Sequence, residues 1–393
     1  MEIRTLKEIP VSGKRVFVRV DFNVPLAEGR VADDTRIVAS LPTIRFLLDG
    51  GARVILASHL GRPKGKRTLE FSLAPAAARL EILLGRRVRL APDCIGPEAE
   101  DAIAKAASGE VVMLENLRFH PEEEANDEQF AKALASLADM YINDAFGAAH
   151  RAHASTAGIT RHLPSAAGLL LEKEVTFLGK ALTNPERPFV AVLGGAKVSD
   201  KIGVIENLFG RMDSLLIGGG MANTFLAARG FRMGKSLVET EKIPLASKLL
   251  ERSERERVPL HLPGDFVITP EIRAGSPFRL APASGIPEDW LAADIGPATA
   301  EVFAEVIRDA GTVLWNGPMG VFELDPFAGG TIAVARAMAE CRGTTILGGG
   351  DSAAAAHKAG VAERLTHIST GGGASLEFLE GRELPGVAAL AGS

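Results

Sequence analysis

Two lysines stand in a stretch whose residue types suit phosphate chemistry, FVAVLGGAKVSDK at residues 189–201. Residues 189–193 are apolar and partly β-branched, which is typical of a buried strand. Two glycines end this strand, and we expect a helix to follow with Lys197 and Lys201 on one face. A glycine turn that leads into a helix presents backbone N–H groups and the positive end of the helix dipole. The stretch is suited to bind a polyphosphate, although a plain turn with two solvated lysines fits it at least as well.

Polar and cationic residues follow the apolar runs of the first half of the chain, and one further arginine begins a helix. These residues are Asp21, Asn23, His59, Arg62, Arg118, Arg151 and the helix-starting Arg36. Arginine presents a planar fork that matches phosphate and carboxylate oxygens, and each charge-assisted bond contributes roughly 1.5–3 kcal/mol. A single such arginine is more often a surface ion pair. Four at equivalent positions in a chain of net charge −5 predict a site for a small, multiply charged anion.

The elements that must position these residues alternate between strand and helix. We expect strands at residues 15–20, 54–58, 111–115 and 138–143, with a helix ending near Leu48 after the first. This alternation predicts a parallel sheet with helices on both faces. In such sheets, ligands bind outside the carboxyl ends of the strands, where the arginines stand.

The second half repeats a strand–glycine–helix unit, which predicts a second doubly wound sheet. The further units begin at residues 214, 312, 344 and 367. Several glycine turns and helix N-termini facing one crevice suit a nucleotide and its phosphates. Asp351 is either a helix N-cap or a Mg²⁺ ligand, and Glu323 is placed to accept hydrogen bonds from ribose hydroxyls.

The length of 393 residues favours two domains of the α/β class. We expect the first at 1–170, a connecting helix at 171–187 and the second at 188–376. We expect the cleft that binds the substrates to lie between these domains. A helix is stiff, so motion would come from its ends.

Composition and charge exclude several classes of protein. The net negative charge and the single tyrosine argue against a nucleic-acid binder. The first residues have no apolar signal segment, and no apolar run reaches the ~20 residues of a membrane-spanning helix, so we expect a cytoplasmic protein. Cys94 and Cys341 are far apart and stand in no Cys/His cluster, which predicts reduced structural thiols. His150 and His153 lack a third ligand at suitable spacing, which disfavours a metal site there.

Two nucleotide-binding motifs are met only in part. The Walker pattern nearly matches at Gly234-Lys235-Ser236, but its first glycine is one residue out of place and the motif follows a helix. The dinucleotide pattern matches at Gly348, Gly350 and Ala353. The next strand, however, ends without the acidic residue that binds the ribose, so NAD binding is disfavoured.

Nine segments together resemble the phosphoglycerate kinase family. They are VDFNVP, SHLGRP, LENLRF, NDAFGAAHRAHAST, GGAKVSDK, GGGMANTFL, WNGPMGVFE, GGGDSAAA and STGGGASLEFLEG, in this order along nearly the whole chain. The resemblance implies phosphoryl transfer between 1,3-bisphosphoglycerate and MgADP, with the acid and the nucleotide held on separate lobes that close to react. It also implies a monomer with small-molecule substrates, and a tail, 377–393, that packs on the first lobe.

The resemblance assigns roles to residues at matching positions. The phosphoglycerate site would comprise Asp21, Phe22, Asn23, Arg36, His59, Leu60, Gly61, Arg62, Arg118 and Arg151. The nucleotide site would comprise Gly195, Lys197, Lys201, Gly219, Asn316, Glu323, Gly349, Gly350, Asp351 and Ser352, with Asp351 on Mg²⁺. The transferring group would be stabilised by Lys197, Arg36, Gly371 and Gly372.

Three positions depart from the family pattern without removing a charge that the chemistry needs. They are Ala148, Asn223 and Ala298.

Two other functions stay open at this point: a dehydrogenase, and a non-catalytic binder of anionic metabolites or nucleotides. The paired sites with Lys197, Lys201 and Asp351 count against the binder.

Overall fold

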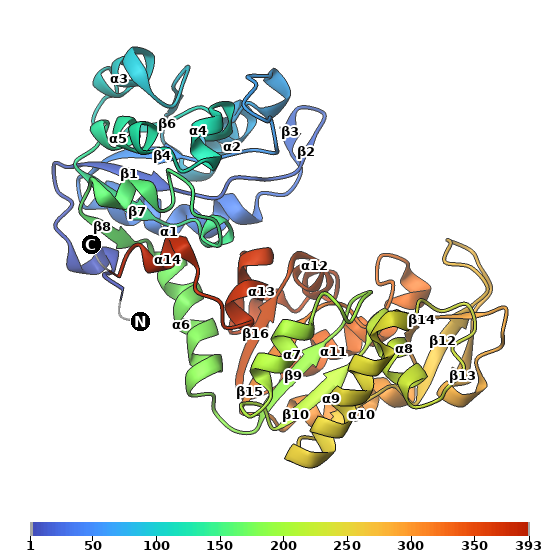
Figure 1. Cartoon of the computed structure of the whole chain (residues 1–393). Coiled ribbons are helices and arrows are strands. Elements are labelled where there is room, and N and C mark those ends of the chain that lie inside the picture. The colour runs from blue at the N-terminus through green and yellow to red at the C-terminus, as the bar shows by residue number, and fades with distance from the viewer. Residues whose placement is uncertain (1–2, 392–393) are drawn as a thin grey trace. The chain divides into compact units, whose positions relative to one another are not determined.

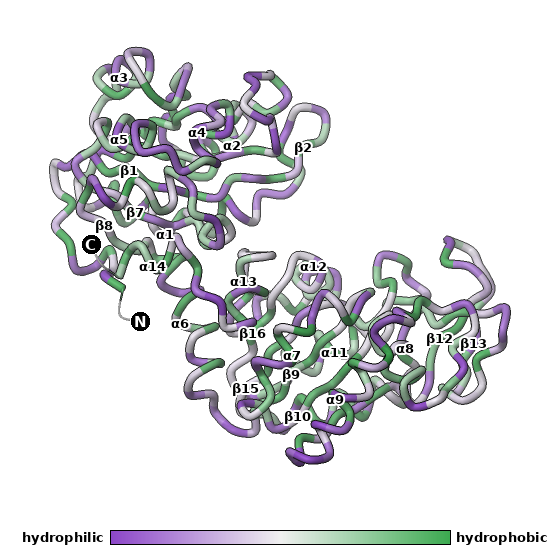
Figure 2. The backbone as a smooth tube through the Cα atoms, viewed as in Figure 1, coloured by the Kyte–Doolittle hydropathy of each residue, from purple (hydrophilic) through white to green (hydrophobic). Residues whose placement is uncertain are grey.

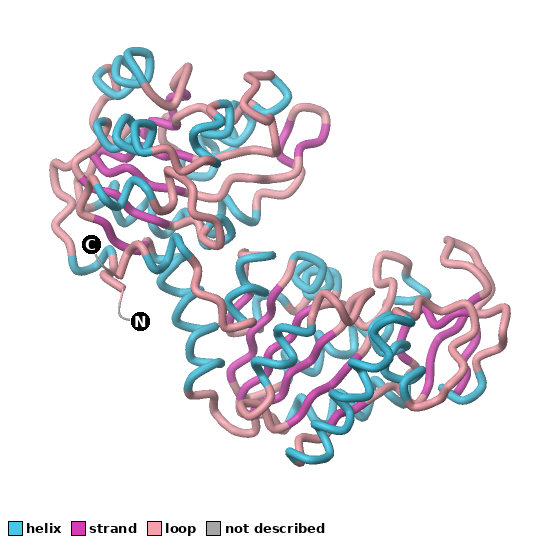
Figure 3. The backbone as a smooth tube through the Cα atoms, viewed as in Figure 1, coloured by secondary structure: helices cyan, strands magenta, loops and turns pink. Residues whose placement is uncertain are grey.

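The computed structural model describes residues 3–391, which form two compact units, each built on its own parallel sheet (Figures 1 and 3). The first unit runs to Thr176 and includes the segment from Glu383, and the second comprises Phe177–Arg382. Helix α6 (Leu169–Thr183) contains the boundary. The expected fold class, two doubly wound α/β domains, is confirmed. The domain limits expected at 170, 188 and 377 stay a prediction.

The sheet of the first unit has the strand order β5-β6-β4-β1-β7-β8, and all of its pairs are parallel. Its strands are β1 (Arg15–Arg19), β4 (Arg53–Ala57), β5 (Val88–Leu90), β6 (Val111–Met113), β7 (Met140–Asn143) and β8 (Ser165–Ala167). Its helices are α1 (Thr35–Asp49), α2 (Ala74–Leu84), α3 (Gly96–Ala104), α4 (Pro121–Glu124), α5 (Glu128–Ser136) and α14 (Pro385–Ala388). A short hairpin joins β2 (Leu26–Ala27) to β3 (Arg30–Val31). The strand order reverses beside β1, the position where such sheets bind ligands.

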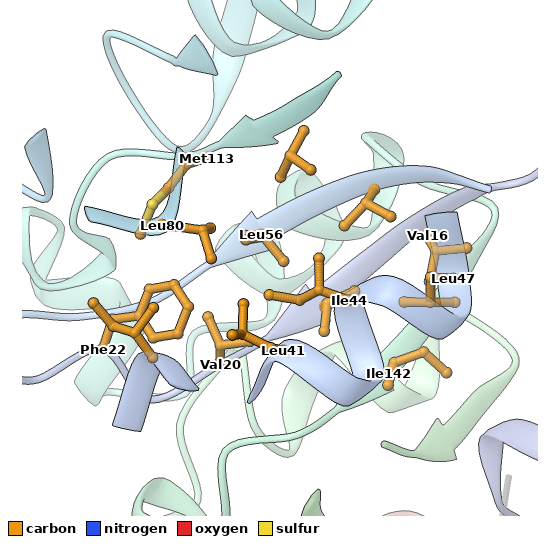
Figure 4. Close-up of a cluster of buried hydrophobic side chains, with 14 of the residues drawn as sticks. Val16, Val20, Phe22, Leu41, Ile44, Leu47, Leu56, Leu80, Met113 and Ile142 are labelled. Carbon is orange, nitrogen blue, oxygen red and sulfur yellow. The ribbon is translucent and has the colours of Figure 1, made fainter. Parts of the chain in front are cut away.

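Apolar side chains of α1 pack against this sheet and form the core of the first unit. Leu41, Ile44 and Leu47 of α1 lie against strand residues such as Val16 and Leu56 (Figure 4). Each fully buried apolar side chain contributes roughly 1.5–3 kcal/mol, so this packing holds α1 and its first turn in place on the sheet.

The sheet of the second unit has the order β11-β10-β9-β15-β16-β17 and is also parallel. Its strands are β9 (Phe189–Leu193), β10 (Ser214–Ile217), β11 (Leu260–His261), β15 (Thr312–Asn316), β16 (Thr344–Gly348) and β17 (His367–Ile368). Its helices are α7 (Ile202–Leu208), α8 (Gly219–Ala228), α9 (Ile243–Glu256), α10 (Pro297–Arg308), α11 (Gly329–Glu340), α12 (Gly350–Lys358) and α13 (Gly373–Leu379). Hydrophobic residues run along its central strands (Figure 2). The strand order reverses between β9 and β15.

An antiparallel sheet in the second unit was not predicted from the sequence. It consists of β13 (Arg279–Pro282), β12 (Asp265–Thr269) and β14 (Leu291–Ile295). Asp265 and Val267 of β12 are only partly buried and alternate with the buried Phe266 and Ile268, so the strand lacks the continuous apolar run that marks the parallel strands. Within residues 3–391, no helix combines the length and the apolar character needed to cross a membrane.

Candidate active site

Asp21, Asn23 and Arg36 of the first unit are joined by hydrogen bonds at the carboxyl end of β1. Nη1 of Arg36 donates to Oδ2 of Asp21 and to the carbonyl oxygen of Asn23, both at 3.1 Å. The side-chain oxygen of Asn23 accepts from the backbone N–H of Gly61 at 2.9 Å, which ties this loop to the one after β4. The Arg36 side chain remains 31% exposed, so its guanidinium is held in place and still accessible to a ligand.

His59, after β4, is buried and electrically neutral. Its Nδ1 lies 3.1 Å from Nη2 of the fully buried Arg19. Burial, with repulsion from Arg19, Arg118 and Arg36, holds the pKa of His59 well below its ordinary value of 6.5. Because a guanidinium can only donate, Nδ1 must accept and the ring proton must stand on Nε2. His59 can therefore donate a hydrogen bond through Nε2.

The remaining predicted residues of the first unit contribute charge or shape to the same edge of the sheet. Nη1 of Arg118 donates to the carbonyl oxygen of Gly61 at 2.9 Å, and Arg62 is exposed on that loop. Burial lowers the pKa of Arg118, and repulsion from Arg19 and Arg151 adds to this effect. Phe22 and Leu60 are buried, so they support the loops that the charged residues occupy.

The buried side chains of Arg19 and Glu123 are linked through Ser155 behind this edge, and neither was identified from the sequence. Nε of Arg19 donates to Oγ of Ser155 at 2.8 Å, and that hydroxyl donates to Oε1 of Glu123 at 2.5 Å. An acidic run such as 122–127 is typical of a solvated surface, but the side chain of Glu123 is fully buried. Its neighbours Glu122 and Glu124 are exposed, so nothing in the run distinguishes the buried member.

His153 contributes no positive charge to the site. Burial and repulsion from Arg19 and Arg118 lower its pKa to about 3. Its Nδ1 lies 3.8 Å from Oε1 of Glu123, and His150 accepts a hydrogen bond from Nε of Arg151 at 3.1 Å. The cations that an anion would meet at this edge are therefore arginines.

In the second unit, two glycine turns meet where the strand order reverses. The N–H of Gly194 donates to the carbonyl oxygen of Asn316 at 3.0 Å, and the N–H of Gly195 donates to that of Pro318 at 3.0 Å. The N–H of Gly219, at the start of α8, donates to the carbonyl oxygen of Met319 at 2.9 Å. These bonds join the glycine turns after β9 and β10 to the backbone after β15, and the joined segments form the floor of the site at the carboxyl ends of these strands.

Two adjoining cavities open above this floor. The first, of about 530 Å³, is mainly apolar; Gly219, Leu237, Phe266, Met319 and Glu323 are among the residues that line it. The second, of about 460 Å³, collects most of the predicted phosphate-binding residues: Gly195, Lys197, Lys201, Asn316, Gly349, Gly350, Asp351, Ser352 and Gly372. Gly195 and Asp351 line both cavities, so one elongated ligand could occupy them together. An apolar chamber beside a cationic, glycine-lined one suits a base joined to phosphates.

The helix after β9 begins later than expected, which changes how the two lysines are presented. α7 starts at Ile202, so Lys197 lies in a loop and Lys201 is the N-cap residue. The prediction that one helical face carries both ammonium groups is wrong. The N–H and Oγ of Ser199 bond to the carboxylate of Glu239 at 3.1 and 2.6 Å, which holds the segment outside a helix. Both lysines nevertheless line the second cavity.

The two lysines differ in burial. Lys201 is buried, its ammonium donates to Oδ1 of Asn316, and burial lowers its pKa against the opposing influence of Asp200 and Asp351. Lys197 is exposed. Lys201 is therefore a fixed donor in the cavity wall, whereas Lys197 is a cation able to reach a ligand.

Helix α12 presents Asp351 and Ser352 from its first turn. Its N-cap residue is Gly349, so the alternative that Asp351 caps this helix is wrong. Asp351 is exposed, while Oγ of the buried Ser352 accepts from the N–H of Gly317 at 2.7 Å. Gly372, with φ of +51°, lines the cavity ahead of α13, and the buried Gly371 donates its N–H to Oγ of Ser369 at 3.1 Å.

Replacing Gly194 with alanine should lower the free energy of unfolding by roughly 1–3 kcal/mol. A β-carbon there would overlap the carbonyl oxygen of Pro318 and lie 2.7 Å from that of Gly317, so the two turns would have to separate. Gly350→Ala is the matched control, because its β-carbon would meet nothing within 4 Å. Urea unfolding of both variants checks this, and equal stabilities would show that the close approach of the turns is not required.

Comparison with known proteins agrees with this geometry. The family model described as phosphoglycerate kinase matches residues 6–382. The chain is 62% identical over 386 residues to the phosphoglycerate kinase of Moorella thermoacetica, covering 98% of both chains. It is 58% identical over 390 residues to that of Pelotomaculum thermopropionicum, covering 99% of both. The solved phosphoglycerate kinase structure from Coxiella burnetii has a TM-score of 0.89 and 41% identity, covering 100% of this chain and 99% of that one. The resemblance found in the sequence motifs is thus confirmed, and the chain belongs to the phosphoglycerate kinase family.

Proposed function

We propose that this protein transfers a phosphoryl group reversibly between 1,3-bisphosphoglycerate and MgADP, giving 3-phosphoglycerate and MgATP. The observation that carries the proposal is the pairing of an arginine-rich anion site on one sheet with a lysine- and glycine-lined cavity on the other. The test is an assay of MgATP consumption with 3-phosphoglycerate as acceptor. ATP consumption should depend on 3-phosphoglycerate, and no turnover with both substrates present would overturn the proposal.

The arginine site suits the acid. Arg36 and Arg118 are held by acceptors in the neighbouring loops and keep N–H groups for ligand oxygens. Arg62 and Arg151 are exposed and add charge that favours a phosphate. The neutral His59 donates through Nε2, which allows it to bind an ester or carboxylate oxygen without adding a further charge to the arginine cluster.

The two cavities of the second unit suit the nucleotide. The base would occupy the apolar cavity, Glu323 would accept from the ribose, and the phosphates would lie over Gly349–Ser352 near Lys201. Mg²⁺, which would arrive with the nucleotide, would supply positive charge to its phosphates. Asp351 is suited to hold Mg²⁺, because it is an exposed carboxylate on the wall shared by both cavities. Mg²⁺ is commonly held by one carboxylate plus substrate phosphates.

Transfer itself needs in-line positioning and cations around the three equatorial oxygens of the moving group. We assign this task to Lys197, Arg36 and the backbone at Gly371 and Gly372, where the N–H of Gly371 would have to leave Oγ of Ser369 to reach the moving group. Arg36 belongs to one unit and Lys197 to the other, so the proposal requires the units to approach when both substrates are bound. Exclusion of water at that moment would protect the acyl phosphate from hydrolysis.

The two other functions predict different results in the same assay. A dehydrogenase would change the absorbance of NADH and require no ATP. A non-catalytic binder would bind 3-phosphoglycerate and MgATP without consuming either.

We also propose that the protein is a cytoplasmic monomer with domains at 1–170 and 188–376. Sedimentation of the purified chain at the mass of one 41.4 kDa copy tests the oligomeric state.

The ring of His59 should not take up a proton between about pH 8 and pH 5. Because its pKa lies well below 6.5, the neutral form persists across this range. NMR of protein with labelled histidines checks this through the Cε1–H resonance, assigned with His59→Gln. A downfield shift of that resonance with a midpoint in this interval would contradict the assignment of His59 as a neutral donor.

A further inference from the structure

The fold of the first unit creates a cluster of possible metal ligands that the sequence did not indicate. Asp93 and Cys94 stand in the loop between β5 and α3, and His120 precedes α4. One side-chain atom from each residue lies within 4.8 Å of the other two. The expectation that Cys94 belongs to no Cys/His cluster is therefore wrong, because the partner histidine comes from a distant part of the chain.

We propose that Asp93, Cys94 and His120 form a binding site for one Zn²⁺ ion. Thiolate, imidazole and carboxylate are the three side-chain ligands that Zn²⁺ uses in proteins, and three protein ligands leave a fourth position for water. Among residues 3–391 this is the group in which such atoms converge. The proposal is independent of the proposed phosphoryl transfer and concerns a different loop from that of Asp351.

Asp93 and His120 need only a small change to accept the ion, and Sγ of Cys94 lies within 4.8 Å of both of their ligand atoms. Nε2 of His120 and Oδ1 of Asp93 are 2.7 Å apart, joined by a hydrogen bond. Tetrahedral Zn²⁺ with bonds of about 2.0 Å to N and O holds those atoms about 3.3 Å apart. The ion would therefore take the place of the proton between them, which would move to Nδ1 of the neutral imidazole, and it would separate the two groups by a fraction of an ångström. The His120 ring packs against Phe130 in a tilted contact, with a centroid distance of 5.3 Å, which limits the rotation of the imidazole.

Charge and access also favour a cation. Cys94 is fully buried. Zn²⁺ binds the thiolate, so binding would displace the thiol proton, and one thiolate with one carboxylate would then neutralise the dication. The side chains of Asp93 and His120 are 29% and 25% exposed, which leaves a path for the ion from solvent. Mg²⁺ would compete weakly, because it prefers an all-oxygen octahedral site.

Titration of the chelator-treated full chain with Co²⁺, a spectroscopic substitute for Zn²⁺, tests the site. One equivalent should bind, with a thiolate-to-cobalt charge-transfer band in the near ultraviolet and release of a proton. Added Zn²⁺ should abolish the band. Cys94→Ser should remove the band, and His120→Gln should weaken binding at least about tenfold. Cys341→Ser, which changes the other cysteine, should leave both signals intact.

The same titration can overturn the proposal. Failure of the wild-type chain to bind Co²⁺ saturably would do so, as would a band that survives in Cys94→Ser or disappears in Cys341→Ser. If Cys94→Ser does not fold, as judged by circular dichroism, His120→Gln decides the question, because the side chain of His120 is partly exposed. Unchanged Co²⁺ affinity in the folded His120→Gln variant would exclude the site.

Discussion

Replacing Lys197 with alanine should lower turnover on the order of a thousandfold and leave ADP affinity nearly unchanged. The exposed ammonium of Lys197 lies in the loop after β9, on the wall of the cavity that suits the phosphates. ADP would be held mainly by the apolar cavity and by Lys201, neither of which depends on Lys197. The charge of Lys197 is therefore needed chiefly when the phosphoryl group carries its developing negative charge.

Steady-state kinetics and calorimetry with ADP measure the two effects of Lys197→Ala separately. Lys248→Ala serves as control, because Lys248 is an exposed lysine of α9 and lines neither cavity. Unchanged turnover in Lys197→Ala would remove Lys197 from the transfer step. Weaker ADP binding with normal turnover would instead make it a nucleotide anchor.

Arg36→Ala should weaken 3-phosphoglycerate binding roughly tenfold to a hundredfold and lower turnover by a further factor on the order of a hundred or more. Arg36 is fixed by Asp21 and the carbonyl oxygen of Asn23, so its fork is already oriented before the acid binds. Loss of the side chain removes both an acid contact and a cation that we place on the transferring group.

Two further variants separate the roles of Arg36. Arg36→Lys keeps the charge and loses the fork, so it should recover part of the turnover but little of the acid affinity. Arg45→Ala, on the exposed side of the same helix, should leave both constants within about twofold of the wild type. A loss of acid affinity alone in Arg36→Ala would show that Arg36 holds substrate without touching the transferring group.

Much of the fold was predictable from sequence because buried parallel strands leave a strong local pattern. The run 189–193 is apolar throughout and is followed by two glycines, and it forms β9 with those limits. Since parallel strands place their carboxyl ends on one edge, the residues that follow them, such as Asn23, Gly61 and Arg118, could be grouped in advance. Their hydrogen bonds to one another bear out this grouping.

The parts of the site that were missed depend on contacts between distant segments. Arg19 lies inside a strand, where a buried arginine has no local signature, and its partner Ser155 is far along the chain. Glu123 looks like its solvated neighbours, and burial singles it out only in the folded unit. The start of α7 was misplaced because Glu239, from another loop, bonds to Ser199 and holds the preceding turn.

The most direct test of the central claim is small-angle X-ray scattering of the wild-type chain with 3-phosphoglycerate and MgADP, separately and together. This pair has no phosphoryl group to transfer, so the complex with both does not turn over. We predict that the radius of gyration decreases when both ligands are bound and changes little with either alone, because each unit holds one substrate. An unchanged radius of gyration with both ligands, at concentrations where calorimetry shows both bound, would contradict the account.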